Sequence, residues 1–143
     1  MSYRFAIIGC GHIAQRHAQC IASIGQLEAV CDVDSARAQA LANKYGALPF
    51  TEVSEMLESQ KPDIVAICSP NGWHAPHSIE CLRSGSHVLC EKPLSINVAD
   101  GTEMILAAKD ANRKLLVVKQ NRFNPPVVAI RKMLDENSLG PIH

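Results

Sequence analysis

The chain has 143 residues, the size of one ordinary domain, and 47% of its residues are apolar while 20% are charged. Lysine and arginine number 14, as do aspartate and glutamate, so the chain lacks the basic composition that favours nucleic acid or acidic lipid. No apolar run approaches the roughly 20 residues that cross a bilayer, and the apolar start lacks a signal-peptide cleavage pattern. These properties predict a cytoplasmic protein that acts on a small molecule, without a nucleic-acid or membrane partner.

Short apolar runs alternate with longer helical stretches along the chain. The predicted strands are residues 4–8, 27–31, 48–50, 64–68, 87–90 and 115–118. The predicted helices are residues 13–24, 35–45, 53–59, 76–84, 98–112 and 126–137. Asp34 and Asn97 are the expected N-caps, while Gly46 and Gly85 follow helix ends. This alternation predicts βαβ units and an α/β fold with a doubly wound parallel sheet of the Rossmann type.

The six cysteines include no C-x-x-C pair, and most of them fall inside apolar segments. In a cytoplasmic chain of this kind we expect free, mostly buried thiols and no disulfide framework. His74 and His77 are three residues apart and can share a helix face. Two histidines alone do not complete a metal site, so we expect none.

Residues 9–14 (GCGHIA) join the first predicted strand to the first predicted helix, which is the setting that a glycine-rich phosphate loop requires. Gly9 permits a tight turn, Gly11 lets a pyrophosphate approach the backbone, and Ala14 is small enough to pack helix against strand. His12 and Ile13 lie at the start of the helix, where free N–H groups favour negative phosphates. We therefore expect a pyrophosphate at this helix start.

Asp32 directly follows the second predicted strand, about 20 residues beyond the loop, where the dinucleotide motif places an acid. Its carboxylate would accept hydrogen bonds from the adenosine ribose and would repel a 2′-phosphate, so the predicted cofactor is NAD in preference to NADP. Two alternatives stay open: a glycine turn that binds no ligand, and an adenosylmethionine-dependent methyltransferase, which the rest of the chain fits less well.

Three further polar segments follow predicted strands, where ligands of open α/β sheets bind. Asn71 and His74, in residues 69–74 (SPNGWH), are placed to reach the cofactor, or else they form a turn and open the next helix. Lys92 is placed to polarise or protonate a substrate oxygen, or else it is an exposed loop lysine. Pro93 restricts Lys92 to an extended backbone and can hold it through a cis bond. The run 119–126, which includes Gln120, meets a substrate or caps the last helix.

The ordered set of glycine loop, Asp32, Ser-Pro-Asn-x-x-His and Glu-Lys-Pro resembles the glucose–fructose oxidoreductase / inositol dehydrogenase (Gfo/Idh/MocA) family over the whole chain. The resemblance implies a dehydrogenase that moves a hydride between a sugar hydroxyl carbon and NAD. It implies that Lys92 is catalytic, because the family lysine contacts substrate and assists hydride transfer. The cofactor-binding residues then expected are Gly9, Gly11, His12, Ile13, Asp32, Ser69, Pro70, Asn71, His74, Glu91, Lys92 and Gln120. A non-catalytic module that senses NAD or another nucleotide is the alternative, in which Lys92 is idle.

Residues 117–122 (VVKQNR) and 78–81 (SIEC) are more narrowly similar to bacterial nucleotide-sugar 3-dehydrogenases, which oxidise UDP-N-acetylglucosaminuronate for surface polysaccharides such as lipopolysaccharide. Family members continue into a C-terminal α+β domain, which carries the oligomer interface, most substrate contacts and a catalytic histidine. We therefore expect residues 1–120 to be the NAD-binding domain and residues 121–143 to be a connecting helix and the start of a domain absent here. The full-length protein is expected to be a homo-oligomer, and this fragment to bind NAD with little or no turnover.

Overall fold

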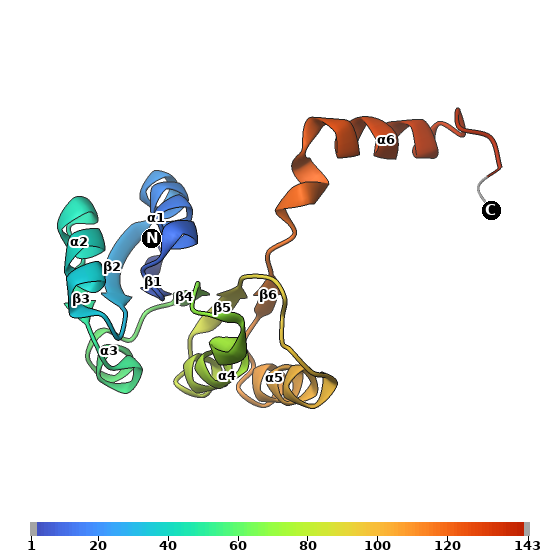
Figure 1. The fold of residues 1–143 in the computed structure, drawn as a ribbon. Coiled ribbons are helices and arrows are strands. Elements are labelled where there is room, and N and C mark those ends of the chain that lie inside the picture. The colour runs from blue at the N-terminus through green and yellow to red at the C-terminus, as the bar shows by residue number, and fades with distance from the viewer. Residues whose placement is uncertain (1–2, 142–143) are drawn as a thin grey trace.

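The computed structural model describes residues 3–141, which fold around a six-stranded parallel sheet (Figure 1). The strands are β1 (Arg4–Ile8), β2 (Gln26–Cys31), β3 (Leu48–Phe50), β4 (Ile64–Ile67), β5 (His87–Cys90) and β6 (Leu115–Val117). Their order is β3-β2-β1-β4-β5-β6, and every pairing is parallel. The chain runs outward from β1, returns to the other side of β1 and runs outward again. This is the expected doubly wound Rossmann sheet, and β1 and β4 flank its switch point.

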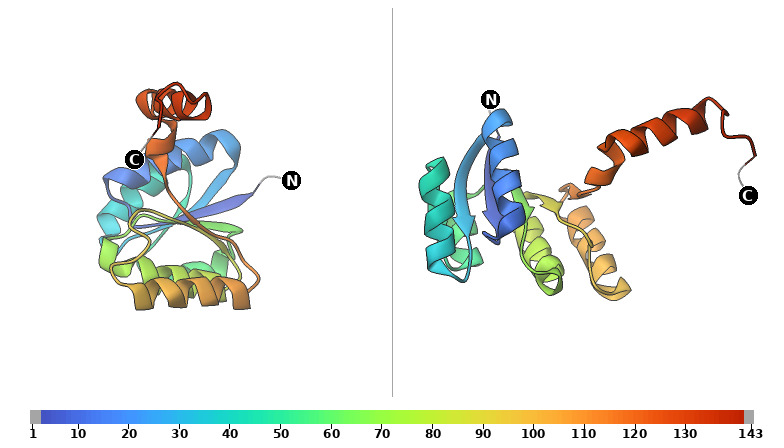
Figure 2. Two further views of the ribbon diagram at one scale, coloured as in Figure 1. Left: turned by 90° about the vertical axis from the view of Figure 1, so that its right-hand side faces the viewer. Right: turned by 45° about the horizontal axis from the view of Figure 1, so that its top comes forward.

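Helices cover both faces of the sheet (Figure 2). They are α1 (His12–Ile24), α2 (Ser35–Tyr45), α3 (Val53–Gln60), α4 (His74–Arg83), α5 (Val98–Asp110) and α6 (Pro125–Asp135), with short 3₁₀ turns η1 (Asn71–Trp73) and η2 (Gln120–Phe123). Helices α1 and α2 pack on one face, while α3, α4 and α5 pack on the other. Strand β1 therefore buries Ile7 on one side and Ile8 on the other, which explains why it is apolar throughout.

The predicted elements are confirmed, with small shifts at their ends. Residues 68 and 118 lie just beyond β4 and β6, where a single backbone bond remains: Cys68 N donates to Ile8 O and Val118 N donates to Cys90 O. Helix α4 begins at His74, two residues before the predicted range 76–84 and at the residue where the turn alternative begins it. Pro76 is accepted there because the first helical N–H groups have no partner within the helix.

The predicted caps are also confirmed. Asp34 Oδ1 accepts a hydrogen bond from Ala36 N at 3.0 Å, and Asn97 Oδ1 accepts one from Asp100 N at 2.8 Å. Gly46 ends α2 at a φ of 71°, in the left-handed region that favours glycine. Each of these helix ends is thus stabilised by a residue close to it in the sequence.

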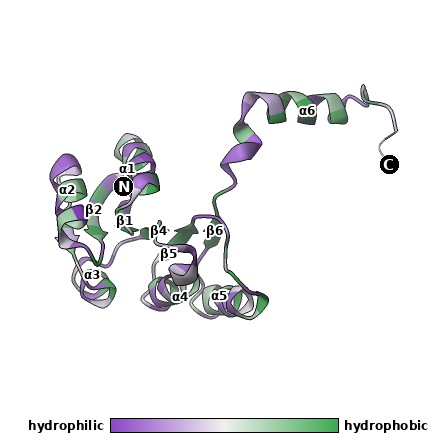
Figure 3. Ribbon diagram, in the orientation of Figure 1, coloured by the Kyte–Doolittle hydropathy of each residue, from purple (hydrophilic) through white to green (hydrophobic). Residues whose placement is uncertain are grey.

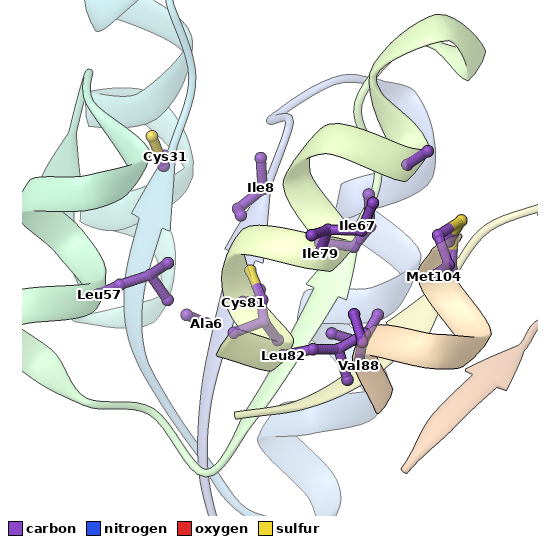
Figure 4. Packing of buried hydrophobic residues seen from close by; sticks show 14 of the residues in the cluster. Ala6, Ile8, Cys31, Leu57, Ile67, Ile79, Cys81, Leu82, Val88 and Met104 are labelled. Atoms are coloured by element: carbon purple, nitrogen blue, oxygen red, sulfur yellow. The ribbon is translucent and has the colours of Figure 1, made fainter. Parts of the chain in front are cut away.

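The larger buried cluster lies under α3, α4 and α5, and its members include Ile67, Leu82 and Met104 (Figure 4). The expectation of free thiols is confirmed: all six cysteines are unpaired, and only Cys20 is exposed. Burial raises the pKa of Cys90 to about 11, so that thiol stays protonated at neutral pH.

Helix α6 differs from the others, because no residue in it is buried and it projects away from the sheet (Figures 1 and 2). Apolar and polar residues both occur along it (Figure 3). Among residues 3–141, no helix is long and apolar enough to cross a membrane.

Candidate dinucleotide site

The glycine loop between β1 and α1 has the geometry that close backbone approach requires. Gly9 has a φ of 89°, and a Cβ on it would lie 2.5 Å from the backbone nitrogen of Ser69. No side chain fits there, because β1 and the segment after β4 pass too close together. A Cβ on Gly11, by contrast, would meet nothing within 4 Å. The space beside Gly11 is therefore open to a ligand.

The start of α1 is available to an anion. Its N-cap is Gly11, which offers no side-chain hydrogen bond, and the first turn contains no acidic residue. The N–H groups of His12 and Ile13 thus keep their hydrogen-bonding capacity and the positive end of the helix dipole. Ala14 is fully buried and lets the helix pack closely on the sheet, the role predicted for it.

Asp32, which follows β2, supports the loop directly. Its Oδ2 accepts a hydrogen bond from Cys10 N at 2.7 Å, and its Oδ1 accepts one from Asp34 N at 2.9 Å. A carboxylate has about four lone-pair sites, so two remain for ribose hydroxyls. Burial, together with the charge of Asp32, raises the pKa of Cys10 to about 12. The loop cysteine is therefore a packed thiol and not a nucleophile.

A cavity of about 170 Å³ opens beside the loop, at the carboxyl ends of β1 to β4. Its walls come from the last residues of β1 and β2 and from residues that follow the strands, and they are predominantly apolar around the one carboxylate of Asp32. The lining residues that the sequence did not predict as cofactor-binding are Ile8, Cys31, Val33, Thr51, Val53, Trp73 and His77. Thr51 directly follows β3, so the rule that ligands bind beyond strand ends also applied to it.

Trp73 and His77 form one wall of this cavity. Their rings stack with centroids 5.3 Å apart, and His77 Nδ1 lies 3.0 Å from Ser69 Oγ. Burial, and to a lesser extent the nearby His74, lowers the pKa of His77. A neutral His77 ring is therefore favoured in this wall.

The segment after β4 divides into exposed and buried parts. Pro70 and Asn71 are exposed at the sheet edge, and Pro70 also lines the cavity. His74 is only 1% exposed: its Nδ1 lies 2.6 Å from Pro93 O, and its Nε2 lies 3.0 Å from Ser69 O. The ring of His74 therefore ties two loops of the edge together from below.

The segment after β5 carries a pair that sequence reasoning missed. Glu91 is buried, and its Oε1 lies 2.8 Å from Nε2 of His17 on α1, while its Oε2 accepts from Lys92 N at 3.2 Å. Lys92 itself is exposed, and the Lys92–Pro93 peptide bond is cis. No local signal marks His17, because its partner is distant in sequence.

Gln120 lies at the far side of the edge, in η2 beyond β6, and it is exposed. Strand β6 is three strand spacings, roughly 14 Å, from β1. The structure thus brings Gly9, Asp32 and Pro70 around one cavity, and it places Lys92 and Gln120 farther along the same edge. Within residues 3–141 no three potential metal ligands gather.

The open helix start, the glycine loop and Asp32 define a dinucleotide-binding domain of the Rossmann class. Residues 3–119 match the family described as "Oxidoreductase family, NAD-binding Rossmann fold" (GFO_IDH_MocA). The chain belongs to this Gfo/Idh/MocA family, and its cofactor is NAD. The methyltransferase alternative is not supported.

Relatives and solved structures agree with this assignment. A D-glucoside 3-dehydrogenase from Escherichia coli is 38% identical over 98% of this chain and 41% of its own length. WlbA dehydrogenase from Chromobacterium violaceum, solved with NADH and UDP-GlcNAcA, has a TM-score of 0.94 and 38% identity over 99% of this chain and 42% of that one. WlbA dehydrogenase from Bordetella pertussis, solved with the same two ligands, has a TM-score of 0.95 and 34% identity over 100% of this chain and 45% of that one. The chain therefore spans less than half the length of these relatives.

Proposed function

We propose that this chain is the cofactor half of an oxidoreductase that moves a hydride between a sugar or nucleotide-sugar hydroxyl carbon and the nicotinamide of NAD. The observation that carries the proposal is the shared carboxyl edge, with an open helix start at Gly11 and an exposed Lys92 two strands farther along. One end of the edge fits a pyrophosphate, and the other presents an ammonium group. The edge can therefore hold the pyrophosphate of an extended dinucleotide at the Gly11 end, and the nicotinamide with the substrate at the Lys92 end.

In this proposal the loop and Asp32 hold the adenosine half of NAD. The N–H groups of His12 and Ile13 donate to the pyrophosphate, and Gly9 and Gly11 let it approach. The two free lone pairs of Asp32 accept from the ribose hydroxyls. Support comes from the apolar cavity around Asp32, whose walls suit a flat base next to a sugar.

The nicotinamide half lies along the segments after β4 and β5. Ser69, Pro70 and Asn71 line its ribose, and His74 and Glu91 hold those segments in place from beneath. When bound, the nicotinamide supplies the site that accepts or returns the hydride. Lys92 donates a hydrogen bond to the reacting hydroxyl oxygen and assists movement of its proton. Gln120 borders the same end of the edge.

The substrate we propose is UDP-N-acetylglucosaminuronate, oxidised at its third carbon during assembly of a surface polysaccharide such as lipopolysaccharide. The support is the similarity to the two WlbA structures solved with UDP-GlcNAcA. We also propose residues 1–120 as the NAD-binding domain and residues 121–143 as a connection to a C-terminal domain that completes the site and the homo-oligomer. Six unpaired cysteines support a reducing compartment such as the cytoplasm.

Binding of NADH to the 143-residue chain tests the cofactor half of the proposal. The chain has one tryptophan, Trp73, and it lines the cavity. We expect saturable energy transfer from Trp73 to NADH, and we expect Trp73→Phe to abolish this signal while calorimetry still detects binding. A folded sample that shows no saturable binding by either method would refute the proposal.

Turnover in the longer protein separates an enzyme from a non-catalytic NAD sensor. The enzyme proposal predicts that Lys92→Ala lowers kcat by about 100-fold or more while NADH binding changes little, because a positioned proton-transfer group contributes about this much. Lys109→Ala, on the far helix α5, is the matched control. If Lys92→Ala and Lys109→Ala behave alike, Lys92 is idle and the sensor alternative holds.

A further inference from the structure

We propose that His17 is a positioning residue for the nicotinamide end of the site: it fixes the Glu91–Lys92–Pro93 loop against the same helix that begins at the phosphate loop. This inference rests on the proposed NAD-binding function. His17 is not among the residues proposed above to contact the cofactor.

The contact between His17 and Glu91 is short and sheltered. Nε2 of His17 lies 2.8 Å from Oε1 of Glu91, and the two side chains are only 12% and 11% exposed. The residues are 74 positions apart, so the contact joins α1 to the segment after β5 across the sheet edge. A sheltered hydrogen bond to a carboxylate is directional and stronger than one between neutral groups.

The loop is held on both sides of Lys92. Glu91 uses one oxygen for His17 and the other for the backbone N–H of Lys92, so its carboxylate orientation is fixed at two points. Pro93 O is held by His74 from α4 at 2.6 Å. Lys92 lies between these two anchors and leaves its own side chain exposed. Removing His17 therefore frees one anchor of the residue proposed to carry the chemistry.

Packing of α1 does not depend on this pair. Ala14, Ala18 and Ile21 already bury the inner face of the helix in the core. The contact fixes the orientation of the Glu91 carboxylate, and loss of His17 leaves that sheltered carboxylate with one partner fewer, at some cost in stability. The expected effect of losing His17 is thus a misplaced loop more than an unfolded helix.

Comparison of two ligands isolates this effect. ADP-ribose shares the adenosine, pyrophosphate and second ribose of NADH but lacks the nicotinamide. In the 143-residue chain, His17→Leu should weaken NADH binding by about tenfold, which corresponds to a freed loop that holds its binding position about one tenth of the time. Binding of ADP-ribose should change less than about twofold, because the phosphate loop and Asp32 are intact. Calorimetry measures both dissociation constants.

Conservative and control variants complete the test. His17→Gln keeps an N–H donor for Glu91 and should restore most of the NADH affinity, and Glu91→Leu, which removes the acceptor, should reproduce the selective loss if His17→Leu fails to fold. Gln19→Leu, on the exposed side of α1, should leave both affinities unchanged. Equal weakening of both ligands, or no rescue by Gln, would overturn the positioning role. A wild-type chain that binds neither ligand would instead overturn the proposed function itself.

Discussion

Asp32 serves two roles at the level of single residues. Its carboxylate accepts hydrogen bonds from Cys10 N and Asp34 N, and so it holds the glycine loop in shape before any ligand arrives. Two lone pairs are left for a ribose, and the negative charge opposes a 2′-phosphate. Substitution therefore changes both the loop and the cofactor preference, and the choice of replacement separates the two effects.

Asp32→Asn and Asp32→Ala are expected to behave differently. Asn keeps a carbonyl oxygen for Cys10 N but removes the charge, so NADH binding should weaken by about tenfold, the cost of one charged hydrogen bond, while NADPH binding is retained or improved. Ala removes the loop support as well and should weaken both cofactors, NADH more than NADPH. Titration of each variant with both cofactors measures this. An equal loss for NADH and NADPH in both variants would refute the assigned role.

His77 makes stability depend on pH. Its folded pKa is lowered by burial, so the folded chain resists a proton that the unfolded chain accepts near pH 6.5. The stability from His77 is fully present above that unfolded pKa and is lost as pH falls toward the lowered folded value. We expect His77→Gln to lose less stability than wild type between about pH 7.5 and about pH 5. Urea unfolding at both pH values measures the difference, and identical pH slopes would exclude this role.

At the level of elements, local sequence signals account for most of the helix boundaries. Asp34 caps α2 through Ala36 N and also pairs with Arg37 at 3.2 Å on the surface. We expect Asp34→Ala to lower the free energy of unfolding by about 1 kcal/mol, the usual value of an N-cap. Arg37→Ala removes only the exposed ion pair and is the control, and it should lower the free energy of unfolding by about 0.3 kcal/mol or less. Chemical denaturation gives both values, and equal losses would mean that the cap is unimportant.

The sheet could be predicted from sequence because each strand is a short apolar run with a turn or helix signal beside it. The glycine loop and Asp32 could be predicted because a strand, a loop and a helix in order give them their context. The sequence left the start of α4 open between His74 and Pro76, because a turn leads directly into the helix. Contacts between distant segments, such as His17 with Glu91, depend on strand order and side-chain direction, which no local pattern encodes.

At the level of the whole molecule, the sheet with its five packed helices is one body and α6 is an appendage. No residue of α6 is buried, although Val127, Val128 and Ile130 are large and apolar. The buried residues of the two cores lie within residues 5–108, and the partly buried Leu115 of β6 packs against one of them. The stability of the domain therefore comes from the part of the chain before residue 121.

A shortened chain ending at Gln120 tests this division. Because residues after 120 bury nothing in the described structure, we expect an unfolding midpoint within about 2 °C of the 143-residue chain and an unchanged NADH affinity. Exposed Val127 and Ile130 would no longer promote association, so the shortened chain should also be less prone to aggregate. Calorimetry and light scattering measure these properties. A large drop in the midpoint would place α6 within the folded unit.

The claim that NAD lies along the carboxyl edge, from the glycine loop to Lys92, is tested most directly by amide NMR spectra during titration with NADH and ADP-ribose. Both ligands should shift the amides of Gly11, His12 and Asp32 in a saturable manner, and only NADH should also shift Lys92. Saturable shifts that avoid the glycine loop and Asp32, or NADH shifts that never reach Lys92, would contradict it.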